Sequence, residues 1–324
     1  MKDRYGREIE YMRISITDRC DLRCRYCMPE GCEKVPMSKI LTYEEIERIC
    51  RVAAGLGISR IKITGGEPFV RKGCTGLIRS IKTIGGIEEV TATTNGQTLE
   101  SYIDELKDIG IDGINISLDT LDPEKYRSIT GRGELSKTLA SIEAAAGSGI
   151  KTKVNCLLQS GLNEDELPDL AGLAFRYGIY VRFIEEMPVG AGKLREGISN
   201  NDVLERLKEE WPDLEPDDSI HGNGPAVYYR RPGVKGGIGL ISAIHGIFCG
   251  SCNRIRLTSQ GKLKPCLCYD TEIDIVPALS GTDEDIADVL REAILSKPEK
   301  HCFNETEEGS GGRRERRLMS QIGG

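Results

Sequence analysis

The 324-residue chain is poor in aromatic residues, with one tryptophan and 5% Phe, Trp and Tyr in all. It has no apolar run near the ~18 residues that cross a bilayer, so we expect no membrane association. Its N-terminus lacks the apolar stretch of a secretory signal, and we expect a cytoplasmic protein. With 44 basic and 51 acidic residues the net charge is −7. This balance gives no general attraction to nucleic acid, which we exclude as a partner.

Length and composition indicate a globular protein with a sizeable core. Apolar residues make up 39% and charged residues 29% of the chain, which excludes a disordered or collagen-like protein. At about 150 residues per domain, the length predicts about two domains. The regular pattern gives way to Gly- and Pro-rich connections after Met187. We place a boundary near residue 220, between a core of residues 4–220 and a C-terminal region of residues 221–324.

Apolar segments rich in Ile and Val alternate with stretches of helical periodicity, the pattern of β/α units. Six strands are predicted, at residues 13–17, 60–64, 89–93, 113–117, 151–157 and 180–184. Helices are predicted at residues 42–56, 99–109, 135–147, 164–177, 201–211 and 282–295, and strand-like runs at 226–230 and 239–243. The fold predicted is α/β, an open and incomplete (β/α)6 barrel.

Alternation along these strands places apolar side chains on one face and polar side chains on the other. The polar set is Lys62, Thr64, Thr93, Asn95, Asn115, Ser117, Asp119, Lys153, Asn155 and Arg182. A closed eight-stranded barrel fills its interior with branched apolar residues, so a polar interior predicts a cavity for a charged ligand. The alternative is a sheet with one solvated face, which is uncommon because parallel sheets are normally covered on both sides.

Cysteine is abundant, with twelve residues, and in a reducing compartment such a number indicates metal or redox chemistry rather than disulfides. One group, C-x3-C-x2-C, follows the first predicted strand and consists of Cys20, Cys24 and Cys27. A structural zinc site needs four ligands, and Cys32 is the nearby spare. Three thiolates on a [4Fe–4S] cluster instead leave one iron open to a substrate or cofactor. The spacing therefore favours a cluster.

A second group has the spacing C-x2-C-x13-C and consists of Cys249, Cys252 and Cys266. Taken alone it fits either zinc or an iron–sulfur cluster, and Cys268 is a candidate fourth ligand. Arg254 and Arg256 alternate along the strand that follows, so both project from one side. Guanidinium groups bind phosphate oxygens in pairs, which predicts a phosphorylated substrate. A surface strand with two solvated arginines is the alternative.

The first cysteine motif, with Tyr26 before its third cysteine, resembles that of the radical S-adenosylmethionine superfamily, whose fold is an incomplete (β/α)6 barrel. The segment Gly65-Gly66-Glu67-Pro68 resembles the family's segment beside the methionine amino group. The resemblance implies a [4Fe–4S] cluster whose open iron chelates S-adenosylmethionine and cleaves it to a 5′-deoxyadenosyl radical. The positions it implies around this cofactor are Tyr26, Gly66, Ser117 and Met187.

Within that superfamily the whole chain, through its terminal Gly323-Gly324, is similar to the GTP 3′,8-cyclases of molybdenum cofactor biosynthesis. The resemblance implies a second [4Fe–4S] cluster on the C-terminal cysteines, whose free iron contacts guanine, and a tail that enters the active site. A C-terminal cluster-binding segment would close the open side of the barrel. The implied GTP positions are Arg13, Lys62, Thr93, Lys153, Arg254, Ile255 and Arg256. By alternation alone, Arg182 is a further cavity candidate.

Other functions remain open at this point. Another radical S-adenosylmethionine enzyme with an auxiliary cluster, such as a peptide maturase, would share the first motif but has no need of the arginine pair. An iron–sulfur electron carrier or a zinc-stabilised binding protein would not need a polar cavity. For the cyclase, the resemblance implies an electron donor and transfer of the product to the next enzyme of molybdopterin synthesis. Monomer and homodimer are both compatible with the sequence.

Overall fold

The predicted strands join one mixed sheet. The computed structural model of the chain describes residues 1–32, 34–189, 198–245, 248–303 and 314–322. In spatial order the twelve strands are β12 (Ile273–Asp274), β11 (Lys262–Lys264), β10 (Arg254–Leu257), β1 (Tyr11–Ser15), β2 (Arg60–Thr64), β3 (Glu89–Thr94), β4 (Gly113–Ser117), β5 (Thr152–Leu158), β6 (Tyr180–Glu185), β9 (Gly237–Ile241), β8 (Val227–Arg230) and β7 (Glu215–Asp217). Strands β10 to β9 in this order are parallel, and the outer strands are antiparallel. The sheet is not closed, which confirms the partial barrel.

The helices are α1 (Tyr43–Gly55), α2 (Cys74–Lys82), α3 (Ile103–Ile109), α4 (Pro123–Thr130), α5 (Leu135–Ser148), α6 (Leu167–Tyr177), α7 (Asn200–Glu210) and α8 (Asp283–Leu295). Helices α2 and α4, which are both short, were not predicted from the sequence. The predicted ranges of α3 and α6 begin too early, because residues 99–102 and 164–166 form 3-10 turns. None of these differences moves a strand of the core.

Local sequence explains where α1 begins. The Thr42 hydroxyl accepts a hydrogen bond from the Glu45 backbone N–H at 3.2 Å, and the Glu45 carboxylate accepts one from the Thr42 N–H at 2.7 Å. This reciprocal capping satisfies two amides that the helix itself cannot pair. Helices α3 and α6 each end at a glycine. Gly110 follows α3 and Gly178 follows α6, with φ of 73° and 66°, a conformation that glycine adopts without strain.

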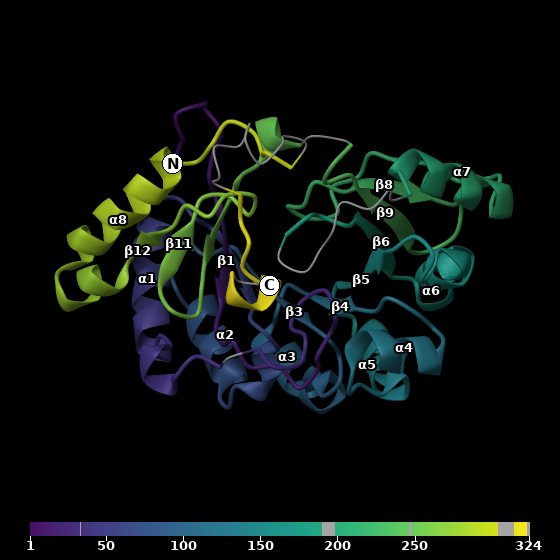
Figure 1. Cartoon of the computed structure of the whole chain (residues 1–324), viewed down its shortest axis with the longest axis horizontal. Helices are drawn as coiled ribbons and strands as arrows, with labels where there is room; N and C mark the ends of the chain where they lie inside the picture. The colour runs from purple at the N-terminus through teal and green to yellow at the C-terminus, as the bar shows by residue number, and fades with distance from the viewer. Residues whose placement is uncertain (33, 190–197, 246–247, 304–313, 323–324) are drawn as a thin grey trace.

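Helices α1 to α6 cover one face of the curved sheet, and the apolar core lies between them (Figure 1). The strands contribute fully buried Ile14, Ile63, Val90 and Ile116 to this core. Because successive side chains alternate, the polar side chains of the same strands face the hollow side of the sheet. The fold thereby separates a buried apolar layer, between the helices and the sheet, from a polar inner surface.

The C-terminal region extends both edges of the central sheet. Strand β10 pairs in parallel with β1 through Arg256 and Arg13, while β9 pairs in parallel with β6 through Gly239 and Arg182. Both strands lie beyond residue 220, so the two predicted regions share one sheet. Figure 1 shows the described end of the chain at the centre of the hollow side, beside β1. Among the described residues, no helix is long and apolar enough to span a membrane.

Candidate functional site

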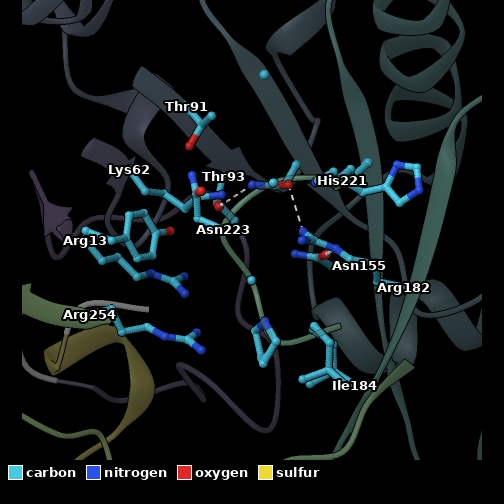
Figure 2. Close-up of a pocket in the computed structure, with 18 of the residues that line it drawn as sticks. Arg13, Lys62, Thr91, Thr93, Asn155, Arg182, Ile184, His221, Asn223 and Arg254 are labelled. Carbon is cyan, nitrogen blue, oxygen red and sulfur yellow. Dashed lines mark hydrogen bonds between the residues drawn. The ribbon is translucent and has the colours of Figure 1, made fainter. Parts of the chain in front are cut away.

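A cavity of about 670 Å³ lies on the hollow side of the sheet. Most of the side chains predicted to bind substrate line it, together with all three cysteines of the second group: Arg13, Lys62, Thr93, Lys153, Arg254, Arg256, Cys249, Cys252 and Cys266. In Figure 2, Arg13 and Arg254 reach into the cavity from one side, and Arg182 and Asn155 lie on the other. Of the ten polar side chains that alternation placed on the inner face, six line this cavity: Lys62, Thr93, Asn115, Lys153, Asn155 and Arg182.

Strand register places three cations side by side. Arg13 on β1 is paired with Arg256 on β10 on one side and with Lys62 on β2 on the other. Burial lowers the pKa of Arg256 to about 9, and the charges of Arg13 and Arg254 add to this effect. Burial, followed by the charges of Arg182 and Arg13, lowers the pKa of Lys62 well below its ordinary value. Like charges held this closely in a buried wall favour an anionic ligand.

On the opposite wall, Arg182 is held by two asparagines. Its Nε donates to Asn155 Oδ1 and its Nη2 to Asn115 Oδ1, both at 2.8 Å. The Asn115 amide in turn donates to Thr93 Oγ1 at 3.4 Å. Lys153 donates to the backbone carbonyl of His221. These bonds fix the direction of each polar group before any ligand binds.

Two arginines keep buried donors unused. The Nε groups of Arg13 and Arg254 have no hydrogen-bond partner within the described part of the chain, although both atoms are buried. A buried N–H without an acceptor costs roughly 1–3 kcal/mol. Both side chains line the cavity, so an anion placed there would remove this cost. The cavity thus carries both the charge and the free donors that a phosphorylated ligand needs.

The second cysteine group lies at the β10 end of the cavity. Cys252 is next to two cations: burial opposes ionisation of its thiol, but Lys297 and Arg254 lower its pKa to about 7. Lys297 Nζ also donates to the backbone carbonyls of Arg254 and Pro265, at 2.9 Å each. The backbone N–H of His301 donates to Cys249 Sγ at 3.3 Å. Thiolates that accept such hydrogen bonds are typical ligands of iron–sulfur clusters.

The first cysteine group lies in the loop after β1. The Leu22 N–H donates to Cys20 Sγ at 3.4 Å, and the Cys27 N–H donates to the Cys24 carbonyl at 3.0 Å. Burial raises the pKa of Cys20 to about 12 and that of Cys27 to about 11. Buried neutral thiols of this kind lose their protons when they bind a metal, because the metal's positive charge compensates the charge of the thiolate. Among the described residues, no three Cys, His, Asp or Glu side chains surround a single-ion site.

The glycines after β2 hold the first cysteine loop in place. The Gly66 N–H donates to the Thr17 carbonyl and the Glu67 N–H to the Arg19 carbonyl, both at 2.7 Å. A Cβ on Gly66 would lie 2.3 Å from the Arg19 carbonyl oxygen, closer than any side chain allows. Glycine is therefore required at this position for the backbones to approach.

Two of the positions predicted for S-adenosylmethionine meet in a second, smaller cavity. Tyr26 and Ser117 line it with Cys24 and Asn95, and its volume is about 30 Å³. The Tyr26 hydroxyl donates to Asp119 Oδ2 at 2.6 Å. Met187 lies apart from them and lines the large cavity. Ile255 lines neither cavity, because its side chain is fully buried in the apolar core.

The C-terminal tail contacts the first cysteine loop. The Ser320 hydroxyl donates to the Cys27 carbonyl at 3.4 Å, and the Ser320 backbone N–H bonds to the Cys27 thiol. Ile322 is fully buried. Composition alone, charged and Gly-rich without periodicity, is typical of a disordered tail, but residues 314–322 pack against the cysteine loop and the neighbouring core. The terminal Gly323 and Gly324 lie outside the described residues.

Sequence reasoning missed Lys297 and His301 as neighbours of the second cysteine group. Both come from a Pro-containing loop after α8, far along the chain from Cys252. The three histidines looked too scattered to mark a site, and a lysine in a charged loop carries no spacing signal. Their contacts arise from the way residues 297–303 fold back across β10, which periodicity cannot show.

Comparisons with known proteins agree along the whole chain. The profile of the Radical SAM superfamily matches residues 14–174, and that described as Molybdenum Cofactor Synthesis C matches residues 179–303. GTP 3′,8-cyclase of Alkaliphilus oremlandii is 48% identical over 331 residues, covering 100% of both chains. The enzymes of that name from Heliobacterium modesticaldum and Clostridium perfringens are 44% and 42% identical, again over 100% of both chains.

Solved structures share the fold at low sequence identity. Streptococcus suis SuiB bound to S-adenosylmethionine matches with a TM-score of 0.65 at 19% identity, over 88% of this chain and 66% of that one. The structure of anSMEcpe with bound AdoMet matches with a TM-score of 0.58 at 16% identity, over 90% of this chain and 82% of that one. At these identities the likeness concerns the fold alone.

Proposed function

We propose, since the chain belongs to the GTP 3′,8-cyclase family of radical S-adenosylmethionine enzymes, that it converts GTP to (8S)-3′,8-cyclo-7,8-dihydroguanosine 5′-triphosphate. This lyase reaction is the first step of molybdenum cofactor biosynthesis, to which the second profile also belongs. The observation that carries the proposal is the single cavity in which the cation row of Arg256, Arg13 and Lys62 lies with the second cysteine group.

The cations would bind the triphosphate. Arg13 and Arg254 would direct their free Nε donors at phosphate oxygens, while Arg256, Lys62 and Lys153 would supply further charge. A triphosphate carries three to four negative charges, and these five cations offset the cost of removing it from water. Thr93 would contribute its hydroxyl from the same wall. Ile255 would act only through its backbone.

The cysteine groups suit two [4Fe–4S] clusters, each with three protein thiols. When bound, the first cluster supplies the electron that cleaves S-adenosylmethionine, and the second offers an open iron to guanine. Cys20, Cys24 and Cys27 would hold the first; Cys249, Cys252 and Cys266 would hold the second. Gly66 would bring the loop backbone close to the cofactor, Tyr26 and Ser117 would contact it from the smaller cavity, and Met187 would contact it from the large one. We also propose that a separate electron donor reduces the protein and that the product passes to the next enzyme of molybdopterin synthesis.

The residues of this chain would orient the substrate and shield the reactive species from water. The asparagine contacts of Arg182 fix the direction of one wall, and the cation row forms the other, so that ribose and base would be held between them. Holding two reacting carbons together replaces a large entropic barrier. The tail segment at Cys27 covers the cysteine loop, which would exclude water from reactive species. No group near the reacting carbons is assigned as a general base.

The peptide-maturase alternative draws on the likeness to SuiB, which is one of fold alone. A peptide would not need a row of buried cations. We also propose that the division near residue 220 separates the radical core from the cluster-binding region, that the protein works in the cytoplasm, and that it functions as a monomer or homodimer.

The direct test is an anaerobic turnover. The chain is reconstituted with iron and sulfide, reduced, and given S-adenosylmethionine with and without GTP. The proposal expects 5′-deoxyadenosine that depends on GTP and a cyclised product with the mass of GTP. Cleavage that GTP does not affect would keep the radical chemistry and remove GTP as substrate.

Gly66→Ala is expected to displace the first cysteine loop, because the new Cβ would lie 2.3 Å from the Arg19 carbonyl oxygen. Overpacking of this kind costs roughly 1–3 kcal/mol. We expect iron content to fall to about half that of the wild type, since one of the two proposed clusters loses its loop. Gly76→Ala is the matched control, because a Cβ there meets no atom within 4 Å. Equal iron content in both variants would contradict the role of this contact.

GTP binding at pH 9 is expected to take up protons. Burial and the charge of Arg182 lower the pKa of Lys153 to about 8, so its amine is largely neutral at pH 9 in the free protein. A bound triphosphate favours the charged form and raises that pKa, which draws in about one proton at Lys153, in addition to the protons taken up by Lys62 and Arg256. Titration calorimetry in two buffers of different ionisation enthalpy measures this uptake. For Lys153→Met the uptake should be smaller; equal uptake would exclude Lys153.

A further inference from the structure

Cys268 and Cys302 form a close pair outside both cysteine groups. Their Sγ atoms are 2.8 Å apart, and both residues are fully buried. The Cys302 backbone N–H donates to Cys268 Sγ at 3.0 Å. An S–S bond is about 2.0 Å long, so only a small movement separates the two thiols from a covalent bond. The pairing joins residues 34 positions apart in the sequence.

The pair lies where three segments of the chain meet. Cys268 is two residues beyond Cys266 of the second group, and Cys302 follows His301, which contacts Cys249. The Cys268 carbonyl accepts a hydrogen bond from the Glu315 N–H at 2.8 Å, which is the start of the described tail. Val189, Ile244, Phe303 and Ile322 surround the pair with apolar surface. A bond between the two sulfurs would fasten the 297–303 segment to the segment of the second cysteine group, beside the tail.

We propose that Cys268 and Cys302 are a disulfide-forming pair, separate from both cluster-binding groups. The sequence left Cys268 as a candidate fourth ligand of the second cluster. In the structure its sulfur is directed at Cys302 and accepts that residue's N–H, so the second cluster keeps three thiols and an open iron. The pair is reduced in a reducing cytosol and closes when the thiol–disulfide balance becomes oxidising.

The oxidant is a low-molecular-weight disulfide, which approaches from the cavity whose lining includes Cys268. The Cys268 sulfur attacks it and gives up its proton to the leaving sulfur, which forms a mixed disulfide and releases one small thiol. The Cys302 sulfur then attacks the Cys268 sulfur of that mixed disulfide and releases the second small thiol. Two protein thiols are oxidised, one small disulfide is reduced to two thiols, and the two protons pass to the released thiolates.

The test uses cystamine as the small disulfide. The anaerobically purified, cluster-loaded chain is treated with excess cystamine, its remaining thiols are blocked with iodoacetamide in denaturant, and the digest is analysed by mass spectrometry. We expect a linked peptide pair that joins Cys268 to Cys302 and disappears on treatment with dithiothreitol. In Cys302→Ser, Cys268 should instead carry one cysteamine. Cys50→Ser, which alters a buried thiol of the main core, should keep the link.

Recovery of Cys268 and Cys302 as two alkylated thiols after cystamine treatment would overturn the proposal. So would a Cys268→Ser chain that loads about half the iron of the wild type, because Cys268 would then be a cluster ligand. Equal iron in that variant supports the assignment, and it also shows that the variant folds. The link is read without substrate, so failure of the GTP reaction and failure of this proposal give different results.

Discussion

Cys24→Ala is expected to abolish the cleavage of S-adenosylmethionine and to reduce the 5′-deoxyadenosine formed by more than about 100-fold. The three thiols of the first loop are the proposed ligands, and the loop's turn depends on the Cys24 carbonyl, which accepts the N–H groups of Cys27 and Met28. That turn survives the substitution, because it uses backbone atoms alone. The loss would therefore report the missing thiol. The measurement is 5′-deoxyadenosine per chain after reduction, with iron content determined on the same sample.

Cys32→Ala is the matched control. Its thiol lies close to the same loop but donates to the Pro29 carbonyl at 2.9 Å and is not a proposed ligand. We expect this variant to retain both its iron and its cleavage activity. Loss of both in Cys32→Ala would indicate four protein ligands in this loop, and with them a site closed to the cofactor.

Arg256→Ala is expected to impair the GTP reaction while leaving the first cluster loaded. Arg256 lies beside Arg13 on the neighbouring strand, and its pKa of about 9, lowered mainly by burial, still leaves it charged at pH 7. Truncating one partner of a buried charge pair typically costs 2–5 kcal/mol, so we expect kcat/KM for GTP to fall by about 100-fold. Steady-state product formation over a range of GTP concentrations measures the effect.

Two variants separate charge from geometry in that experiment. Arg256→Lys keeps the charge but loses the fork that binds two oxygens at once, so it should fall between alanine and wild type. Arg230→Ala removes an exposed arginine of β8 that is bonded to Glu215 of the edge strand β7 and should have no effect. Unchanged turnover in Arg256→Ala would remove this residue from the proposed binding wall.

The positions of the six barrel strands and their polar face could be predicted because both follow from short-range patterns. Alternation along each strand identified Lys62, Lys153 and Arg182 as cavity residues, and the structure places all three on its wall. The capping residues of α1 were equally local. Such a pattern depends on which side chains must avoid water, so it can be read from a short stretch of sequence without the rest of the fold.

Contacts between distant segments could not be predicted in the same way. The approach of Lys297 to Cys252 and of Ser320 to Cys27 depends on how loops cross the sheet, and no periodic signal specifies it. The adjacency of Arg256 and Arg13 arose from parallel pairing of β10 with β1, which brings the C-terminal region into the central sheet. The pairing of Cys268 with Cys302 was hidden for the same reason.

The most direct measurement follows one hydrogen atom. GTP deuterated at ribose C3′ is turned over anaerobically by the reconstituted enzyme, and the deuterium content of the 5′-deoxyadenosine is measured by mass spectrometry. If the cavity holds GTP with its ribose facing the cleaved cofactor, the 5′-deoxyadenosine gains one deuterium from C3′. Unlabelled 5′-deoxyadenosine formed alongside product would contradict the account, because the hydrogen would then come from another position or another molecule.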